Sequence, residues 1–306
     1  MEKLLSVRAL ERRYGEHLAL AAVDLRLTRG EVLGLLGPNG AGKTTCLQIL
    51  SGNLAPTAGE VRVLGVDLVR APLRAKRNIG YLPERPPLYP DMRVDEYLDY
   101  CARLHRVSRR RRADAVSRAK SRCGLAEAGR RPLAKLSKGY RQRVGIAQAI
   151  LHEPDLVILD EPTEGLDPVQ IREVRDLIRD LAATCGVILS SHILPEVQAV
   201  CSKVVILSDG RVLHQARLDE DAPGLGRFRV KLLRAPPLPV LTALPGVASA
   251  QSLGADSFRV TLRPGEAPAQ LARLLVEQGC GLMELVPDGT DLERVFFDIL
   301  GGEQAA

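Results

Sequence analysis

The chain lacks several features that would narrow its function at once. It contains no tryptophan, and aromatic residues make up only 3% of it, so its core must rest on leucine, valine, isoleucine and alanine. No stretch approaches the roughly 18 apolar residues of a membrane-spanning helix. Residues 1–15 carry charges where a secretory leader has its apolar centre. These absences predict a cytoplasmic protein that reaches a membrane only through a partner.

The cysteine spacing and the charge balance also exclude some classes. The six cysteines are scattered and form no C-x-x-C pair, which favours reduced core thiols over a disulfide framework or a zinc site. There is no acidic excess, because the net charge is +6 and the isoelectric point is about 9.1. This mild basic excess is compatible with nucleotide phosphates, anionic lipid or nucleic acid, and does not distinguish among them.

The chain does contain a glycine-rich loop between a predicted strand and a predicted helix. GPNGAGKT at 37–44 follows the apolar run EVLGLLG and precedes KTTCLQILSGN, which has helical spacing. Glycines let backbone N–H groups curl around phosphate oxygens, and the helix adds its positive end. Lys43 suits the β- and γ-phosphates and Thr44 suits Mg²⁺. The predicted nucleotide contacts are Gly37, Pro38, Asn39, Gly40, Ala41, Gly42, Lys43, Thr44 and Thr45.

A second apolar strand, LVILD at 156–160, ends in a pair of carboxylates. The carboxyl edge of a parallel sheet is where such folds bind ligands. Asp160 is therefore predicted to hold Mg²⁺ through water, and Glu161 to orient or deprotonate the attacking water. Taken alone, an acidic pair after a strand could simply start a loop. The matching phosphate loop favours the catalytic interpretation.

The segment LSKGYRQR at 136–143 resembles the LSGGQ signature of ATP-binding cassette (ABC) proteins. Ser137 and Gly139 are retained, whereas Lys138 and Tyr140 depart from the pattern. A hydroxyl and backbone N–H groups at a helix start form an anion-binding concavity. The resemblance implies that this concavity closes over the γ-phosphate held by a second copy of the cassette. A serine N-cap on an arginine-rich helix is the simpler alternative.

The same resemblance implies roles for four further residues. His192, at the end of GVILSSH, stands where ABC cassettes carry the switch histidine that contacts the γ-phosphate. EGLDP at 164–168 resembles the D-loop, with Asp167 at the dimer contact, although this aspartate could also cap a helix. Tyr14 resembles the adenine-stacking aromatic, or is a core tyrosine. Glu84 replaces the usual glutamine that reaches Mg²⁺, and a carboxylate can also bind that ion.

The predicted fold class is α/β, with two domains. The first is a phosphate-loop cassette over residues 1–222, with a helical subdomain at about 88–145. The second, over 226–306, has a β-α-β-β-α-β pattern that predicts a small ferredoxin-like α+β domain, with its last helix expected at 291–299. We expect this domain to regulate or support the cassette dimer.

YLPERPPLYPDMRV, LSKGYRQR and SSHILPEV, with the C-terminal domain, resemble the ATPase subunits of type-2 ABC exporters. The resemblance implies ATP and Mg²⁺ as cofactors, a cassette dimer, and a separate membrane permease that places the chain on the cytoplasmic face of the cell membrane. No nucleic-acid partner is expected. The alternative is a soluble ABC ATPase acting on the ribosome or on nucleic acid. The run Arg109–Arg112, without interleaved aromatic residues, is interpreted as a solvated helix face.

Overall fold

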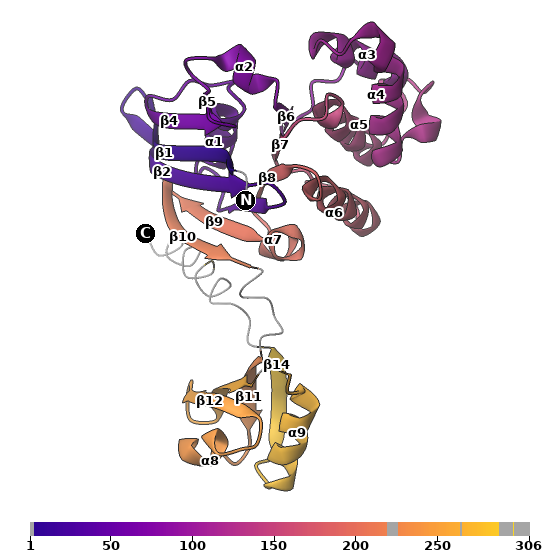
Figure 1. Cartoon of the computed structure of the whole chain (residues 1–306). Coiled ribbons are helices and arrows are strands. Elements are labelled where there is room, and N and C mark those ends of the chain that lie inside the picture. Colours follow the sequence, from indigo (N-terminus) through magenta and orange to yellow (C-terminus); the bar gives the residue numbers. More distant parts are fainter. Residues whose placement is uncertain (1–2, 219–225, 264, 288–295, 297–306) are drawn as a thin grey trace. The chain divides into compact units, whose positions relative to one another are not determined.

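The computed structural model describes residues 3–218, 226–263, 265–287 and 296. The chain divides into two compact units, Met1–Arg217 and Leu218–Ala306 (Figure 1). Each unit has a hydrophobic core of its own, as independently folding domains do. All six cysteines are buried and free of disulfides, in agreement with the predicted core thiols.

The larger sheet of the first unit has six strands in the order β10-β9-β3-β8-β7-β6. Neighbours from β9 to β6 are parallel, and β10 pairs antiparallel with β9. Every residue of β3, β7 and β8 is buried, as expected for parallel strands covered on both faces. The strands are β3 (Val32–Leu36), β6 (Ile79–Leu82), β7 (Leu156–Leu159), β8 (Gly186–Ser191), β9 (Lys203–Ser208) and β10 (Arg211–Arg217).

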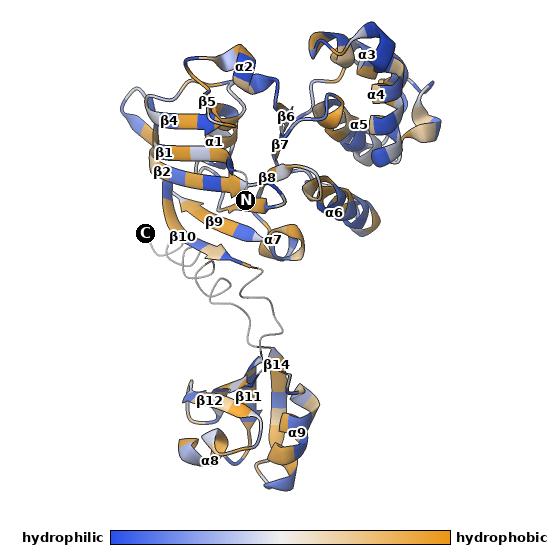
Figure 2. Ribbon diagram, viewed as in Figure 1, coloured by the Kyte–Doolittle hydropathy of each residue, from blue (hydrophilic) through white to orange (hydrophobic). Residues whose placement is uncertain are grey.

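The second sheet of this unit is antiparallel, in the order β2-β1-β4-β5. Hydrophobic and hydrophilic residues alternate along β2 (Figure 2), so one face of the sheet joins the core. The apolar and polar alternation at the start of the chain predicts a strand over residues 3–9. The observed β1 runs on to Tyr14, because register shifts and a positive φ at Ala9 let the strand bend and continue. The strands are β1 (Lys3–Tyr14), β2 (His17–Thr28), β4 (Ala58–Val63) and β5 (Val66–Asp67).

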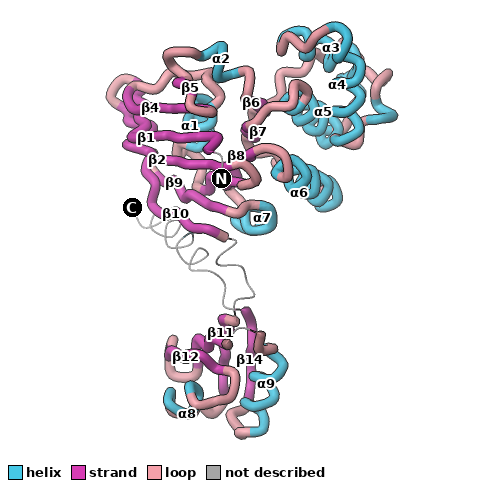
Figure 3. Tube along the Cα trace, viewed as in Figure 1, coloured by secondary structure: helices cyan, strands magenta, loops and turns pink. Residues whose placement is uncertain are grey.

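Helix α1 packs against both sheets, with Leu47 and Leu50 in the shared core. Helices α3, α4 and α5 gather into a group beside the sheets (Figure 3). The helical subdomain is predicted to end at about residue 145. Its last helix, α5, continues to Ile150 because it packs on β6 and β7. The helices are α1 (Lys43–Leu50), α2 (Pro72–Lys76), α3 (Val94–Leu104), α4 (Arg109–Arg122), α5 (Lys138–Ile150), α6 (Pro168–Ala182) and α7 (Leu194–Val200), with 3-10 turns at Ala126–Ala128 and Leu133–Lys135.

Over its described residues, the second unit contains a four-stranded antiparallel sheet and two helices. Its strands lie in the order β12-β13-β11-β14, and the element order is the β-α-β-β-α-β of a ferredoxin-like unit. The helix expected at 291–299 falls outside the described residues except for Phe296. The elements are β11 (Arg227–Leu232), α8 (Leu238–Thr242), β12 (Val247–Ser252), β13 (Ser257–Leu262), α9 (Pro268–Glu277) and β14 (Leu282–Pro287).

Over the described ranges of both units, no helix combines the length and the apolar character needed to span a membrane.

Candidate active site

Four of the predicted site segments follow four neighbouring strands of the six-stranded sheet. β3, β8, β7 and β6 run parallel, with Leu36 beside Ser191 and Leu159 beside Leu189. Their carboxyl ends therefore lie along one edge of the sheet, where such sheets bind ligands. One residue directly follows each of β3, β8 and β7, and these are Gly37, His192 and Asp160. Glu84 lies two positions after the end of β6.

Glycine is required in the loop between β3 and α1 because the chain packs closely there. A Cβ at Gly37 would overlap the carbonyl oxygen of Leu207. Gly42 has a φ of 98°, and a Cβ there would lie 2.7 Å from the carbonyl oxygen of Ala19. Only glycine meets both demands without strain. The loop thus brings its backbone to the start of α1, where helix N–H groups attract anions.

Lys43, the first residue of α1, is 7% exposed, and its side chain lies along the loop. Its Nζ donates to the carbonyl oxygens of Gly37 at 2.8 Å and Pro38 at 3.1 Å. The same atom lies 3.7 Å from Glu161 Oε1. Burial lowers the pKa of Lys43, and the Glu161 carboxylate acts in the opposite direction. The ammonium group therefore stands between the phosphate loop and the acidic strand end.

Asp160 and Thr44 meet beside it. Thr44 Oγ1 and Ser190 Oγ donate to Asp160 Oδ1 at 3.4 and 2.7 Å. The other oxygen, Oδ2, is buried without a hydrogen-bond partner, and burial raises the pKa of Asp160. A buried carboxylate oxygen without a partner is costly, which fits a cation ligand.

The donor set also matches Mg²⁺ in kind. That ion is usually held by one or two carboxylates together with substrate phosphates and water, and rarely by a cage made of protein alone. Across the described residues, no group of three or more histidine, cysteine, aspartate or glutamate side chains could hold a metal. A hydroxyl from Thr44 and a carboxylate from Asp160 therefore fit a magnesium ion shared with phosphate oxygens.

Glu161 has the most constrained conformation of the acidic pair. Its φ is 46°, a left-handed value that is uncommon for residues other than glycine. Its N–H donates to Ser190 Oγ at 2.8 Å, and its Oε2 lies 3.1 Å from His192 Nδ1. Burial raises the pKa of Glu161, while His192 and Lys43 oppose that rise. The structure thus brings Glu161, His192 and Lys43 together, with the carboxylate between the other two.

Glu84 acts on the same group from the end of β6. Burial is the main cause of the raised pKa of Asp160, and the negative charge of Glu84 adds to that rise. Burial lowers the pKa of Lys43, and the charge of Glu84 opposes that fall. Glu84 also lines a groove of about 520 Å³ together with Lys138 at the start of α5 and Glu164 beyond β7. It therefore borders both the acidic strand end and the signature helix.

The signature and the D-loop segment pack against each other at the starts of α5 and α6. Ser137 caps α5 by accepting from the Tyr140 N–H at 3.3 Å, and Asp167 caps α6 by accepting from the Gln170 N–H at 2.9 Å. A Cβ at Gly139 would overlap the Gln170 amide. Ser137 and Asp167 therefore cap these helices, as the alternative interpretation of each motif predicts, and the two helix starts form one surface within the chain.

Tyr14 lies at the end of β1, where the β1–β2 hairpin turns. It is 43% exposed and pairs with His17, and the Arg12 guanidinium lies 4.5 Å from the centre of its ring. An exposed ring with a cation on one face is not a core tyrosine. The part of β2 that follows reaches the phosphate loop, because Ala19 contacts Gly42.

Sequence reasoning did not single out Ser190, Thr163 and Glu196, which hold the acidic strand end in place. Ser190 bonds both acidic residues, as described above. Glu196 in α7 accepts hydrogen bonds from Thr163 at 2.5 Å and from Ser191 at 3.3 Å, so it joins the segment after β7 to the last residue of β8. The one available signal was the serine pair that ends the apolar strand GVILSS.

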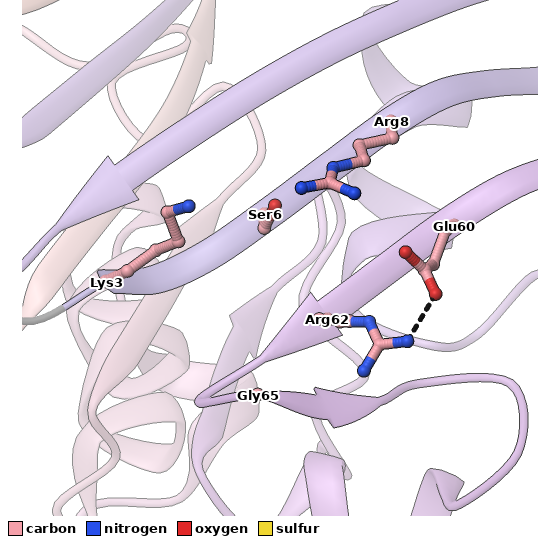
Figure 4. A pocket seen from close by; sticks show the side chains of 6 residues that line it. All are labelled: Lys3, Ser6, Arg8, Glu60, Arg62 and Gly65. Carbon is pink, nitrogen blue, oxygen red and sulfur yellow. Dashed lines mark hydrogen bonds and ion pairs between the residues drawn. The ribbon is translucent and has the colours of Figure 1, made fainter.

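A separate pocket on the antiparallel sheet contains none of the predicted site residues. It is lined by β1 and β4, with Lys3 and Arg8 beside an Arg62–Glu60 ion pair of 2.5 Å (Figure 4). Both members of that pair are well exposed, and such pairs contribute little. The chemistry of the chain therefore concentrates at the carboxyl edge of the six-stranded sheet.

The chain is similar to known proteins in sequence and in fold. The sequence model of the ABC transporter family matches residues 20–164. The daunorubicin resistance ATP-binding protein DrrA3 of Streptomyces coeruleorubidus is 34% identical over 306 residues, which cover 98% of this chain and 96% of DrrA3. The chain belongs to the ABC transporter family. Within it, the chain is an ATP-binding subunit, as predicted from its motifs.

Two further comparisons agree with this ABC assignment. The bacitracin transport ATP-binding protein BcrA of Bacillus licheniformis is 34% identical over 221 residues, 72% of this chain and 71% of BcrA. A solved ATP-binding subunit of an ABC transporter superposes with a TM-score of 0.65 at 33% identity, covering 71% of this chain and 91% of that one. These matches confirm the predicted ABC cassette fold of the first unit.

Proposed function

We propose that this ABC subunit hydrolyses ATP and couples each hydrolysis to transport through a separate membrane permease, in the direction of export. The observation that carries the proposal is the convergence of Lys43, Asp160, Glu161 and His192 at one sheet edge, with an orphaned carboxylate oxygen on Asp160. A cation, a base and a partner for that base are the groups that phosphoryl transfer to water needs.

The phosphates bind at the loop and at the start of α1. Backbone N–H groups of the loop, which Pro38 lacks, face the phosphate oxygens, and the Lys43 ammonium pairs with the β- and γ-phosphates. Thr45 adds a hydroxyl donor. Tyr14 stacks on the adenine, which its exposed ring and its place on the hairpin beside the loop support.

Thr44, Asp160 and Glu84 would hold the magnesium ion. The ion would supply charge neutralisation between the β- and γ-phosphates. The buried and unpaired Oδ2 of Asp160 supports this role, and the carboxylate at residue 84 adds negative charge that a glutamine would not.

Glu161 accepts a proton from the water that attacks the γ-phosphorus, as the bond from that phosphorus to the bridging oxygen breaks and leaves ADP. A raised pKa makes this carboxylate a stronger base than an exposed one. His192 holds the carboxylate from the far side at 3.1 Å and contacts the γ-phosphate through its other ring nitrogen. The pair therefore connects the presence of the γ-phosphate to the position of the base.

Hydrolysis takes place in a dimer of two copies. Ser137 and Gly139 of one copy complete the site around the γ-phosphate held by the other, and Asp167 lies at the contact between the copies. The common surface that the starts of α5 and α6 form supports this assignment, since both motifs would meet the partner together. ATP then shifts a two-state equilibrium toward the closed dimer.

The permease and the export direction rest on the relatives. DrrA3 is named for drug resistance and BcrA for bacitracin transport. The solved cbiO1 chain, with a TM-score of 0.66 at 28% identity, is described as part of the ABC transporter complex cbiONQ. A subunit of this kind lies at the cytoplasmic face of the cell membrane, bound to a membrane partner. A nucleic-acid partner is not part of the proposal.

Purification of the tagged chain from gently solubilised membranes, with ATP present, tests the coupling. We expect a multi-spanning protein in stoichiometric amount, which would also be the chain that selects the substrate. Co-purification of ribosomes or nucleic acid, with no membrane protein, would instead support the soluble ABC ATPase and overturn the proposal.

A further inference from the structure

A second pocket, of about 490 Å³, lies at the edge of the six-stranded sheet opposite the phosphate loop. It is lined by the end of α2, the turn between α3 and α4, part of α4 and the turn after α5. His152 ties it to the sheet, because its Nε2 lies 3.0 Å from the carbonyl oxygen of Ile79, the first residue of β6. The length of β6 separates this pocket from Glu84. The volume is within the range of pockets that hold small molecules.

The lining of this pocket carries an excess of positive charge. One carboxylate, Glu153, lies 3.6 Å from Arg111 and 3.0 Å from Arg118. Within the described chain, the guanidinium groups of Arg77 and Arg106 take part in no hydrogen bond or ion pair. Four arginines thus face one carboxylate, and two of the four have no counter-charge. Arg111 belongs to the run interpreted as a solvated helix face, and its side chain is 70% exposed.

Two histidines form the wall next to the sheet. The rings of His105 and His152 stack with centroids 3.8 Å apart and planes 8° from parallel. Burial, assisted by His105, lowers the pKa of His152 to about 4, so the ring is neutral near pH 7. Its Nε2–H donates to Ile79, and Nδ1 is a buried acceptor without a partner. A buried acceptor without a partner needs a donor, which a bound water or a ligand hydroxyl can supply and a bare phosphate oxygen cannot.

We propose that this pocket binds the phosphate group of an anionic ligand, with Arg77 and Arg106 as its principal contacts. Planar guanidinium groups match the oxygens of a phosphate in pairs, and charge-assisted hydrogen bonds of this kind are the strong ones. A bound phosphate supplies the counter-charge that Glu153 cannot give to all four arginines. A phosphorylated small molecule and a lipid headgroup present the same chemistry, and the proposal is independent of the hydrolysis proposed above.

The test uses the full chain saturated with ADP and Mg²⁺, so that the phosphate loop is filled. Inorganic pyrophosphate is titrated by calorimetry into the native chain, into Arg77→Gln/Arg106→Gln, and into the control Arg70→Gln/Arg273→Gln. The control removes the same charge at two exposed arginines outside the pocket. In parallel, each chain is sedimented with vesicles of phosphatidylcholine, with or without phosphatidic acid.

We expect the native and control chains to bind one equivalent of pyrophosphate, and the pocket variant to bind it on the order of a hundredfold more weakly, since each lost charge-assisted bond costs about tenfold. If the ligand is a lipid headgroup, the pocket variant should bind vesicles containing phosphatidic acid more weakly than the native and control chains do. The three chains would then not differ in their binding of pyrophosphate. Equal binding by the pocket and control variants in both assays, or no binding in either, would overturn the proposal.

Discussion

At the scale of the residue, Glu161 combines two energetic costs, which are backbone strain and the burial of a carboxylate. It combines a left-handed φ of 46°, burial, and a raised pKa, and its N–H is held by Ser190. Strain and desolvation of this kind persist where the surrounding structure fixes them, and they cluster at functional sites. Both costs would be hard to explain if Glu161 only started a loop.

The substitution Glu161→Gln tests this residue most sharply. Hydrolysis should fall by about 10²-fold or more because the base is lost, whereas ATP binding should remain and closed dimers should accumulate. The raised pKa means that ionisation of Glu161 destabilises the fold as pH rises through that pKa, so the melting temperature near pH 7 should not fall. Single-turnover hydrolysis, nucleotide titration and calorimetric melting measure these effects.

Asp176→Asn on the exposed side of α6 is the matched control, and its turnover should remain normal. Normal turnover by Glu161→Gln would mean that another group is the base.

The pH profile of hydrolysis should follow the ionisation of Glu161. The base acts as a carboxylate, so the rate should fall as pH drops through its raised pKa. The His192 hydrogen bond lowers that pKa, so removing it in His192→Ala should move the acid limb to higher pH, apart from any loss of maximal rate. The measurement is kcat/KM across pH for both chains. An acid limb that stays in place, or moves to lower pH, would show that His192 does not lower the pKa of the base.

At the scale of the element, the phosphate loop depends on two different properties of glycine. Gly37 needs space, because a Cβ would overlap the Leu207 carbonyl oxygen, whereas Gly40 has open space but a φ of 85°. Gly37→Ala should destabilise the cassette by about 3 kcal/mol through overpacking against backbone. Gly40→Ala should cost about 1 kcal/mol through left-handed strain. Urea unfolding of both variants compares the two, and an equal or reversed order would contradict the packing described.

The hydrophobic pattern of the sequence predicts which helices and strands exist, but it does not predict where they end. The strand–loop–helix at 31–52 and the acidic end of β7 are visible in the sequence because apolar runs there stop at glycine or aspartate. The extension of β1 to Tyr14 depends on bulges, and that of α5 to Ile150 depends on packing against β6 and β7. Neither cause has a local signal.

The candidate site shows the same division. Lys43, Asp160 and Glu161 stand in motifs, so their types and spacing reveal them. Ser190 and Glu196 act only because β7, β8 and α7 are neighbours in space, and a single sequence does not give that adjacency. The unpaired Oδ2 of Asp160, which supports the metal role, likewise depends on the folded surroundings.

At the scale of the whole molecule, two units with separate cores predict separable stability. A chain ending at residue 222 should fold and bind ATP with the affinity of the full chain, since every described residue of the candidate site lies before that point. Circular dichroism and nucleotide titration provide the measurement. An unfolded product would refute the boundary, and a folded product with lost binding would place part of the site in the second unit.

Two copies are central to the account, because one chain is proposed to hold only part of each ATP site. The most direct test mixes two inactive variants, Lys43→Ala and Ser137→Ala. In a mixed dimer, the intact phosphate loop of one copy meets the intact signature of the other, and one of the two sites is complete. Since half of the dimers are mixed, the mixture should regain about a quarter of native hydrolysis while each variant alone stays inactive. No recovery in a mixture shown to exchange subunits, or full activity of Ser137→Ala alone, would contradict the shared site.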